Sequence, residues 1–358
     1  MKAIEIEIIP IESDSLSVSV AYPSEPAPPL IKRWQVQRKL IDSIVREIEE
    51  VVTSSVDVDQ FPNEDLLEHF QNLGLGFFEV LLMHEADSLL DALSEGDKYL
   101  LFKVDRSLAY LPFEALFDGR QFLSLSFTIS RLIYSPHSAS PRDVKSQKRG
   151  ILIVGDPSDD PLIRGDVERE IDILRDALRS LSPSPLTILV GREVDEAVLL
   201  ANLNNLLIFH FTGHGIFGDH DERSGLLLRD EGVLTAQQIS GLQIPPRIVF
   251  LNCCAAGSID AWRTSIGLIE TLLLRGTKVC VAPIWTVTSI SATTIAQHFY
   301  HNLIEGKSFG EALRLARVAA RNVTNESDLG WAAYTLYGDP LACLVEEESH
   351  SCLLYTSP

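Results

Sequence analysis

Two short stretches of the sequence combine residue types that could carry out nucleophilic chemistry. Residues 210–215 read His-Phe-Thr-Gly-His-Gly, and residues 251–257 read Leu-Asn-Cys-Cys-Ala-Ala-Gly. A thiol attacks a carbonyl group as the thiolate, so it needs a neighbouring imidazole or backbone N–H groups that lower its pKa. His214 lies between two glycines, which allow the backbone to approach a substrate closely. These residue types indicate acyl transfer through a cysteine nucleophile.

Each stretch lies at the carboxyl end of a predicted buried strand. The two strands are expected at 206–211 and 247–253. They belong to a longer alternation of strands at 150–155, 186–190 and 278–283 with helices at 164–181, 193–203, 264–275, 291–303 and 309–322. Such an alternation predicts a mostly parallel sheet with helices on both faces. Because chemistry collects at the carboxyl ends of these strands, we expect both stretches at one edge of the sheet.

The first 148 residues are expected to form a smaller α+β companion domain without a His/Cys pair of its own. Alternating apolar residues predict an antiparallel pair of strands at 2–9 and 16–22, and an apolar run predicts a strand at 98–104. A proline-rich segment at 23–29 is expected to serve as a spacer to a helix. Gly74 and Gly76 are expected to break a later helical region in two.

Three segments follow from these predictions. The companion domain of residues 1–148 is predicted to end in an exposed, polar linker at about 135–149. A catalytic domain is predicted at 150–345. Residues 346–358 are expected to form an acidic or disordered tail.

Composition excludes several classes of protein. The 358 residues are 46% hydrophobic and 22% charged, which is typical of a globular protein. The net charge of −20 repels a phosphate backbone, so no direct nucleic-acid partner is expected. Five cysteines with one adjacent pair do not resemble a secreted disulfide framework, which favours a cytoplasmic location. No run of about 18 uncharged apolar residues occurs, so no membrane partner is expected.

The sequence resembles the caspase-like CHAT cysteine peptidases, relatives of caspases and separase. HFTGHG at 210–215 is similar to the family's H-x-x-G-H-G, and LNCCAAG at 251–257 is similar to its L-S-A-C-E-T-G. The similarity continues through 267–270, 276–279, 284–287 and 331–340, and DRSLAYLPFEAL at 105–116 resembles a stretch that precedes many such domains. The resemblance implies a caspase-like α/β/α sandwich with a mostly parallel central sheet. It also implies a preceding pseudo-caspase-like companion domain, whose LPFEAL segment packs against the catalytic sheet.

The resemblance also implies roles for individual residues. His214 matches the family's catalytic histidine, and Cys254 matches its nucleophile. The backbone N–H groups of Gly215 and Cys254 would form the oxyanion hole. Cys253 falls where the family has a small alanine and is expected to be a buried core residue. No third residue that would orient His214 is evident.

The function implied is that of a cysteine endopeptidase that cleaves a protein substrate through a Cys254 thioester. The resemblance implies a regulated effector in a prokaryotic stress or defence pathway, under the control of an activating sensor protein. No cofactor and no metal are implied.

Asp156 is a candidate for substrate recognition. In caspase-like folds the loop after this strand lines the pocket for P1, the residue before the scissile bond. Asp156 could therefore bind a basic P1 side chain, although an aspartate before a proline is also typical of a turn. Thr288-Ser289 replace an acidic residue that many members carry after W-x-V, which favours an uncharged P1.

Three alternatives remain open. His210 and His214 could bind zinc with His220 and Cys254, although His-x-x-x-His at a strand end does not present both rings on one side as a helix does. The chain could be a catalytically silent caspase-like module that only binds other proteins. It could also be a nucleotide-binding α/β module, although the segment at 155–157 lacks a phosphate-loop pattern.

Overall fold

The computed structural model describes most of the chain. The described residues are 3–12, 14–23, 28–56, 65–82, 85–95, 99–134, 150–181, 184–217, 224–253 and 259–344. The predicted nucleophile Cys254, the predicted linker at 135–149 and the predicted tail at 346–358 lie outside these residues, as does His220.

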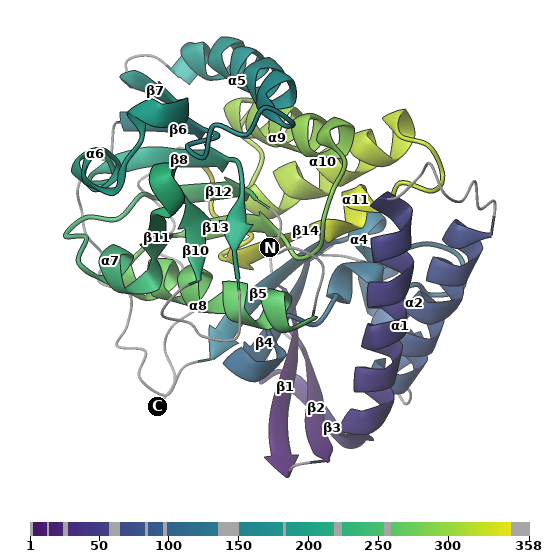
Figure 1. Cartoon of the computed structure of the whole chain (residues 1–358). Coiled ribbons are helices and arrows are strands. Elements are labelled where there is room, and N and C mark those ends of the chain that lie inside the picture. The colour runs from purple at the N-terminus through teal and green to yellow at the C-terminus, as the bar shows by residue number, and fades with distance from the viewer. Residues whose placement is uncertain are drawn as a thin grey trace.

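A single sheet of eleven strands runs through the molecule (Figure 1), in the order β3-β2-β1-β4-β5-β14-β13-β12-β8-β6-β7. The strands are β1 (Ile4–Glu12), β2 (Ser15–Tyr22), β3 (Leu30–Gln37), β4 (Tyr99–Asp105), β5 (Thr128–Tyr134), β6 (Gly150–Gly155), β7 (Leu186–Val190), β8 (Leu206–Thr212), β12 (Ile248–Asn252), β13 (Val279–Pro283) and β14 (Tyr334–Gly338). Neighbours are parallel except at β1–β2, β2–β3 and β13–β14. The predicted α/β class with a mostly parallel sheet is confirmed.

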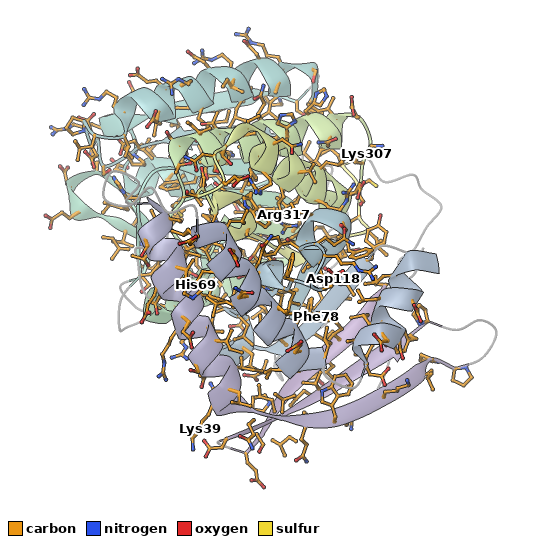
Figure 2. All side chains as sticks on the ribbon, turned by 90° about the vertical axis from the view of Figure 1, so that its right-hand side faces the viewer. Lys39, His69, Phe78, Asp118, Lys307 and Arg317 are labelled. Carbon is orange, nitrogen blue, oxygen red and sulfur yellow. The ribbon has the colours of Figure 1, made fainter. Side chains whose placement is uncertain are left out.

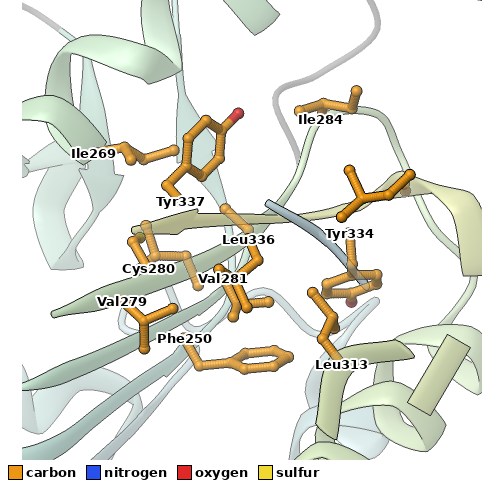
Figure 3. Close-up of a cluster of buried hydrophobic side chains, with 14 of the residues drawn as sticks. Phe250, Ile269, Val279, Cys280, Val281, Ile284, Leu313, Tyr334, Leu336 and Tyr337 are labelled. Carbon is orange, nitrogen blue, oxygen red and sulfur yellow. The ribbon is translucent and has the colours of Figure 1, made fainter. Parts of the chain in front are cut away.

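Helices cover both faces of the sheet in the second half of the chain. The longer ones are α5 (Arg164–Leu178), α8 (Ile259–Arg275), α9 (Ser289–Ile304) and α10 (Phe309–Val323). Ile269 of α8 and Tyr337 lie on one side of the β13–β14 pair, and Phe250 and Leu313 of α10 lie on the other (Figure 3). Every residue of β12, β13 and β14 is buried. This burial explains the unbroken apolar runs from which two of these strands were predicted.

Shorter elements complete this half. They are α6 (Glu196–Asn202), α7 (Ala236–Ser240), α11 (Gly330–Ala333) and a small separate sheet of β9 (Gly215–Ile216), β10 (Gly225–Leu227) and β11 (Val233–Thr235). The five strands predicted from residue 150 to 283 are all present. Strand β14 was not predicted as a strand.

The first half contains two strands that the sequence did not predict, β3 and β5. The helices here are α1 (Arg38–Val56), α2 (Leu66–Leu82), α3 (Ala86–Glu95) and α4 (Leu123–Ser126). Between the proline-rich segment and α1 lies β3, which pairs antiparallel with β2 along its whole length. Because β3 is the edge strand, most of its side chains are exposed and its apolar alternation is weak. The predicted helix is present as α1, and β3 lies between it and the spacer.

Helix α2 runs without a break through both of its glycines, so the predicted division there is wrong. A β-carbon at Gly74 would lie 2.2 Å from the carbonyl oxygen of Ala115. Gly74 is thus the residue that lets the LPFEAL segment approach the helix, and this packing outweighs the low helix propensity of glycine.

A buried charge cluster joins the LPFEAL segment to both halves of the molecule. The Glu114 carboxylate forms an ion pair with Arg131 of β5, and its Oε1 lies 3.6 Å from Nη2 of Arg317 of α10. All three side chains are fully buried. Figure 2 shows Arg317 near the middle of the molecule, where the helices of the two halves meet. At this junction β5 and β14 pair only at Arg131 and Tyr337.

None of the helices in the described part of the chain is long and apolar enough to cross a membrane.

Candidate active site

Three neighbouring strands end at the same level of the sheet. Gly155, the last residue of β6, pairs with Thr212, the last residue of β8, and Thr212 pairs in turn with Asn252 at the end of β12. The backbone N–H of Asp156 donates to the carbonyl oxygen of Thr212 at 2.8 Å, which extends the pairing past the strand end. The predicted site residues Asp156 and His214 thus leave the sheet at one edge, where parallel α/β sheets place their functional residues.

His214 is held through both its side chain and its main chain. Its Nε2 lies 3.0 Å from Oδ2 of Asp160, and the imidazole is 40% exposed. Its carbonyl oxygen accepts a hydrogen bond of 2.9 Å from the N–H of Leu227 in β10. Asp160 is a candidate orienting residue that the sequence did not reveal. It comes 54 residues before His214, in the loop after a different strand.

The loop that presents Asp160 has an unusual backbone. Asp156 and Asp159 adopt φ angles of 38° and 58°, in the left-handed region where aspartate is one of the few tolerated residues besides glycine. Oδ1 of Asp160 accepts the N–H of Leu162 at 2.9 Å. That hydrogen bond, followed by the contact with His214, holds the pKa of the Asp160 carboxyl below its usual value. Asp160 therefore meets His214 as a carboxylate at neutral pH.

Asp156 itself is buried beside a small cavity. Its side chain is 3% exposed, and its Oδ1 accepts the hydroxyl of Ser158 at 2.5 Å. The cavity has a volume of about 330 Å³ and is lined by Asp156, Asp159, Arg164, Val167, Glu168, Val190, Gly191 and Arg192. Both arginines pair with Asp159, at 2.8 and 3.2 Å. The bond to Ser158 and the left-handed φ fit the role of a turn residue.

Of the two adjacent cysteines, the structure describes the first. Cys253 is 4% exposed and belongs to the hydrophobic core, as predicted. Cys254 follows it directly and lies outside the described residues.

Gly215, the predicted oxyanion-hole residue, is the first residue of strand β9 in the small sheet. A β-carbon at this position would lie 2.4 Å from Cε2 of Phe217. Only glycine fits at that position without a shift of the ring.

His210 is a buried residue of the core of the site. Its Nδ1 lies 3.1 Å from the hydroxyl of Tyr300, and its Nε2 lies 2.9 Å from Oε1 of Glu170. Both ring nitrogens are thus engaged, so His210 does not share a metal with His214 in this arrangement. Among the described residues, no group of three or more His, Cys, Asp or Glu side chains could hold a metal ion.

A buried carboxylate lies beside Thr288, where the sequence lacks the acidic residue of many family members. The Thr288 hydroxyl donates to Oδ2 of Asp328 at 2.7 Å and accepts the N–H of Ser291 as the N-cap of α9. Asp328 also accepts the hydroxyl of Ser291 at 3.0 Å. No sequence signal connects positions 40 residues apart in this way.

Sheet order and helical layers define a caspase-like α/β protein. A family model described as the CHAT domain matches residues 79–339, and the chain belongs to this family. Among solved structures, the chain is similar to separase of Saccharomyces cerevisiae, crystallised in a complex with securin. The structure at 3.0 Å resolution gives a TM-score of 0.58 at 12% identity, over 94% of this chain and 30% of the separase chain.

A second structure of the same complex, at 2.6 Å resolution, gives a TM-score of 0.45 at 16% identity, over 85% of this chain and 23% of the separase chain. This chain therefore spans less than a third of the separase chain. At these identities the likeness concerns the fold alone. No curated protein sequence matches the chain.

Proposed function

We propose that this chain is a cysteine endopeptidase that hydrolyses peptide bonds of a protein substrate through a Cys254 thioester. The observation that carries the proposal is the pairing of His214 with Asp160 at the level where β8 and β12 end. His214 and Cys254 each come two residues after the paired residues Thr212 and Asn252. This register favours a position for Cys254 within reach of the imidazole.

The first half-reaction forms the thioester. His214 accepts the Cys254 proton, and the sulfur attacks the carbonyl carbon while an electron pair moves to the carbonyl oxygen. The N–H groups of Gly215 and Cys254 would stabilise this oxyanion. When the intermediate collapses, the C–N bond breaks and the leaving amine takes the proton from His214.

The second half-reaction is hydrolysis. His214 accepts a proton from water, and the hydroxide formed attacks the thioester carbon. The C–S bond then breaks, the acid product leaves, and the sulfur recovers its proton. Because Asp160 engages Nε2, the nitrogen left to exchange protons is Nδ1. Asp160 would hold the ring in this orientation and stabilise the imidazolium formed in each half-reaction.

We propose further that a protein partner controls this activity. Separase was crystallised with a bound protein, securin. The family resemblance implies an effector under the control of a sensor protein, in the cytoplasm and in a prokaryotic stress or defence pathway.

A peptidyl acyloxymethyl ketone tests the proposal directly, because it alkylates a cysteine only where a peptide binds beside an activated thiol. The label should appear on Cys254 by mass spectrometry and should be lost in His214→Ala. A peptide library would show cleavage in parallel. A protein that binds peptides but neither reacts at Cys254 nor cleaves any of them would instead be a silent interaction module.

A further inference from the structure

A single buried carboxylate joins the strands that carry the candidate catalytic residues. Glu170 lies in α5, and its side chain is 5% exposed. Its Oε1 lies 2.7 Å from Nδ2 of Asn252 and 2.9 Å from Nε2 of His210. Its Oε2 accepts the hydroxyl of Thr212 at 3.0 Å. Both strand ends, at Thr212 and Asn252, are therefore bound to one side chain from a third element.

The surrounding groups complete this network. Burial, and the negative charge of Glu170, raise the pKa of Tyr300, so its hydroxyl keeps its proton and can donate to Nδ1 of His210. His210 then carries its hydrogen on Nε2 and donates it to Glu170. The carbonyl oxygen of the Asn252 side chain accepts the hydroxyl of Tyr334. Buried networks satisfied in this way hold their members in one arrangement.

The network lies at the two strand ends that precede the proposed catalytic residues in the sequence. Thr212 and Asn252 are cross-strand partners, and His214 and Cys254 follow each of them by two residues. Helix α5 begins at Arg164, four residues after Asp160. The Glu170 carboxylate is thus the point at which the segments that lead to Asp160, His214 and Cys254 are joined.

We infer that Glu170 is a positioning residue of the proposed peptidase, which fixes the spacing between the ends of β8 and β12 and so between His214 and Cys254. This inference rests on the proposed function. Glu170 acts through Thr212 and Asn252 and does not touch the substrate.

Two substitutions separate this role from a general contribution to stability. Glu170→Ala removes all three hydrogen bonds. Glu170→Gln keeps the shape, because its oxygen can accept from His210 and Asn252 while its amide group donates to the Thr212 oxygen. Leu174→Ala is the matched control, since Leu174 is fully buried one turn further along the same helix and forms no part of the network.

The experiment combines hydrogen exchange with the reactivity of Cys254 in the full chain. The Gly213 amide bonds to the carbonyl oxygen of Asn252 at 3.2 Å and so reports the spacing of the strand ends without any substrate. In Glu170→Ala, exchange at Gly213 should accelerate about 10-fold relative to Ile208 in the same strand, and the rate of Cys254 alkylation by iodoacetamide should fall by about 10-fold or more. Glu170→Gln should retain most of that rate.

Unchanged exchange at Gly213 in Glu170→Ala, or an equal loss of Cys254 reactivity in Leu174→Ala, would overturn the inference. If Glu170→Ala does not fold, Thr212→Val decides in its place, because it removes one donor and preserves the shape. A wild-type Cys254 that reacts no faster than a free thiol would refute the proposed function instead, and exchange at Gly213 would still decide the role of Glu170.

Discussion

Oδ2 of Asp160 lies 3.0 Å from Nε2 of His214, and this contact assigns the two nitrogens of the imidazole to different partners. One nitrogen faces a carboxylate in the loop after β6, and the other is left for chemistry at the end of β8. The carboxylate is itself fixed by the N–H of Leu162. A histidine held in this way is oriented before a substrate arrives.

Replacing Asp160 by asparagine should therefore impair the proposed reaction more than it impairs folding. We expect kcat/KM to fall by about 10-fold or more, because the variant loses part of the ~10²–10⁴-fold that a positioned general acid–base typically contributes. Asp166→Asn, which removes an exposed carboxylate from the first turn of α5, is the control and should behave like the wild type. Equal kinetics for Asp160→Asn and Asp166→Asn would show that Asp160 does not orient His214.

The Asp160 carboxyl should titrate below the usual aspartate pKa of 3.8. Because its pKa is lower in the folded state, its contribution to stability is present above the usual value and is lost as the pH falls through the lowered one. In His214→Ala its pKa should rise but stay below 3.8, since the hydrogen bond from Leu162 is the larger cause. NMR titration of the carboxyl carbon measures both values, and a midpoint at or above 3.8 in the variant would contradict this ranking.

Substitutions of the two adjacent cysteines should have different effects on activity. Cys254→Ala should abolish peptide cleavage without unfolding the chain. Cys253→Ala should retain most of the activity and cost about 1 kcal/mol of unfolding free energy, because it removes a buried sulfur from the core. Activity assays and denaturant unfolding test both variants. Equal loss of activity in the two would indicate a shared thiolate site, which zinc analysis would identify.

Asp156 should behave as a turn residue. Asp156→Ala should cost about 1–2 kcal/mol of unfolding free energy, because alanine adopts a left-handed φ poorly. Asp156→Asn should cost less, since asparagine tolerates this φ and can still accept the Ser158 hydroxyl. Substrates with Arg and with uncharged P1 residues should be affected alike. A selective loss of Arg and Lys substrates would assign Asp156 to a P1 pocket instead.

The parts of the fold that the sequence predicts are those with an unbroken apolar signal. Strands β6, β8, β12 and β13 are buried on both faces, so their sequences are mostly apolar. Edge strand β3 is mostly exposed and leaves little pattern. The sequence predicts a helix break at Gly74, because the carbonyl group of Ala115 that approaches it comes from a distant segment and leaves no local signal.

The residues of the candidate site likewise fall into those that the sequence predicts and those that it does not. His214 and Asp156 were found because each follows a recognisable strand. Asp160, Glu170 and Asp328 were not found, because each acts on residues between 37 and 82 positions away. Only the tertiary structure brings such groups together, and an isolated acidic residue has no local pattern that distinguishes it from a solvated one.

The buried cluster of Glu114, Arg131 and Arg317 should be essential for stability. Burial lowers the pKa of Arg317 to about 10, and Glu114 opposes that shift. Glu114→Gln leaves two guanidinium groups in the interior without a counter-charge, which should cost about 3–5 kcal/mol of unfolding free energy. Asp172→Asn, which breaks an exposed pair with Arg175, should cost less than about 1 kcal/mol.

The dependence on salt concentration further distinguishes the stability cost of Glu114→Gln from that of Asp172→Asn. The cost of Glu114→Gln should be the same at about 0.1 and 1 M NaCl, because buried charges are screened little, whereas any effect of Asp172→Asn should shrink at high salt. Urea unfolding followed by circular dichroism measures both. A cost below about 1 kcal/mol for Glu114→Gln would mean that the glutamine side chain still satisfies both arginines, and that the charge of Glu114 does not hold the two halves of the sheet together.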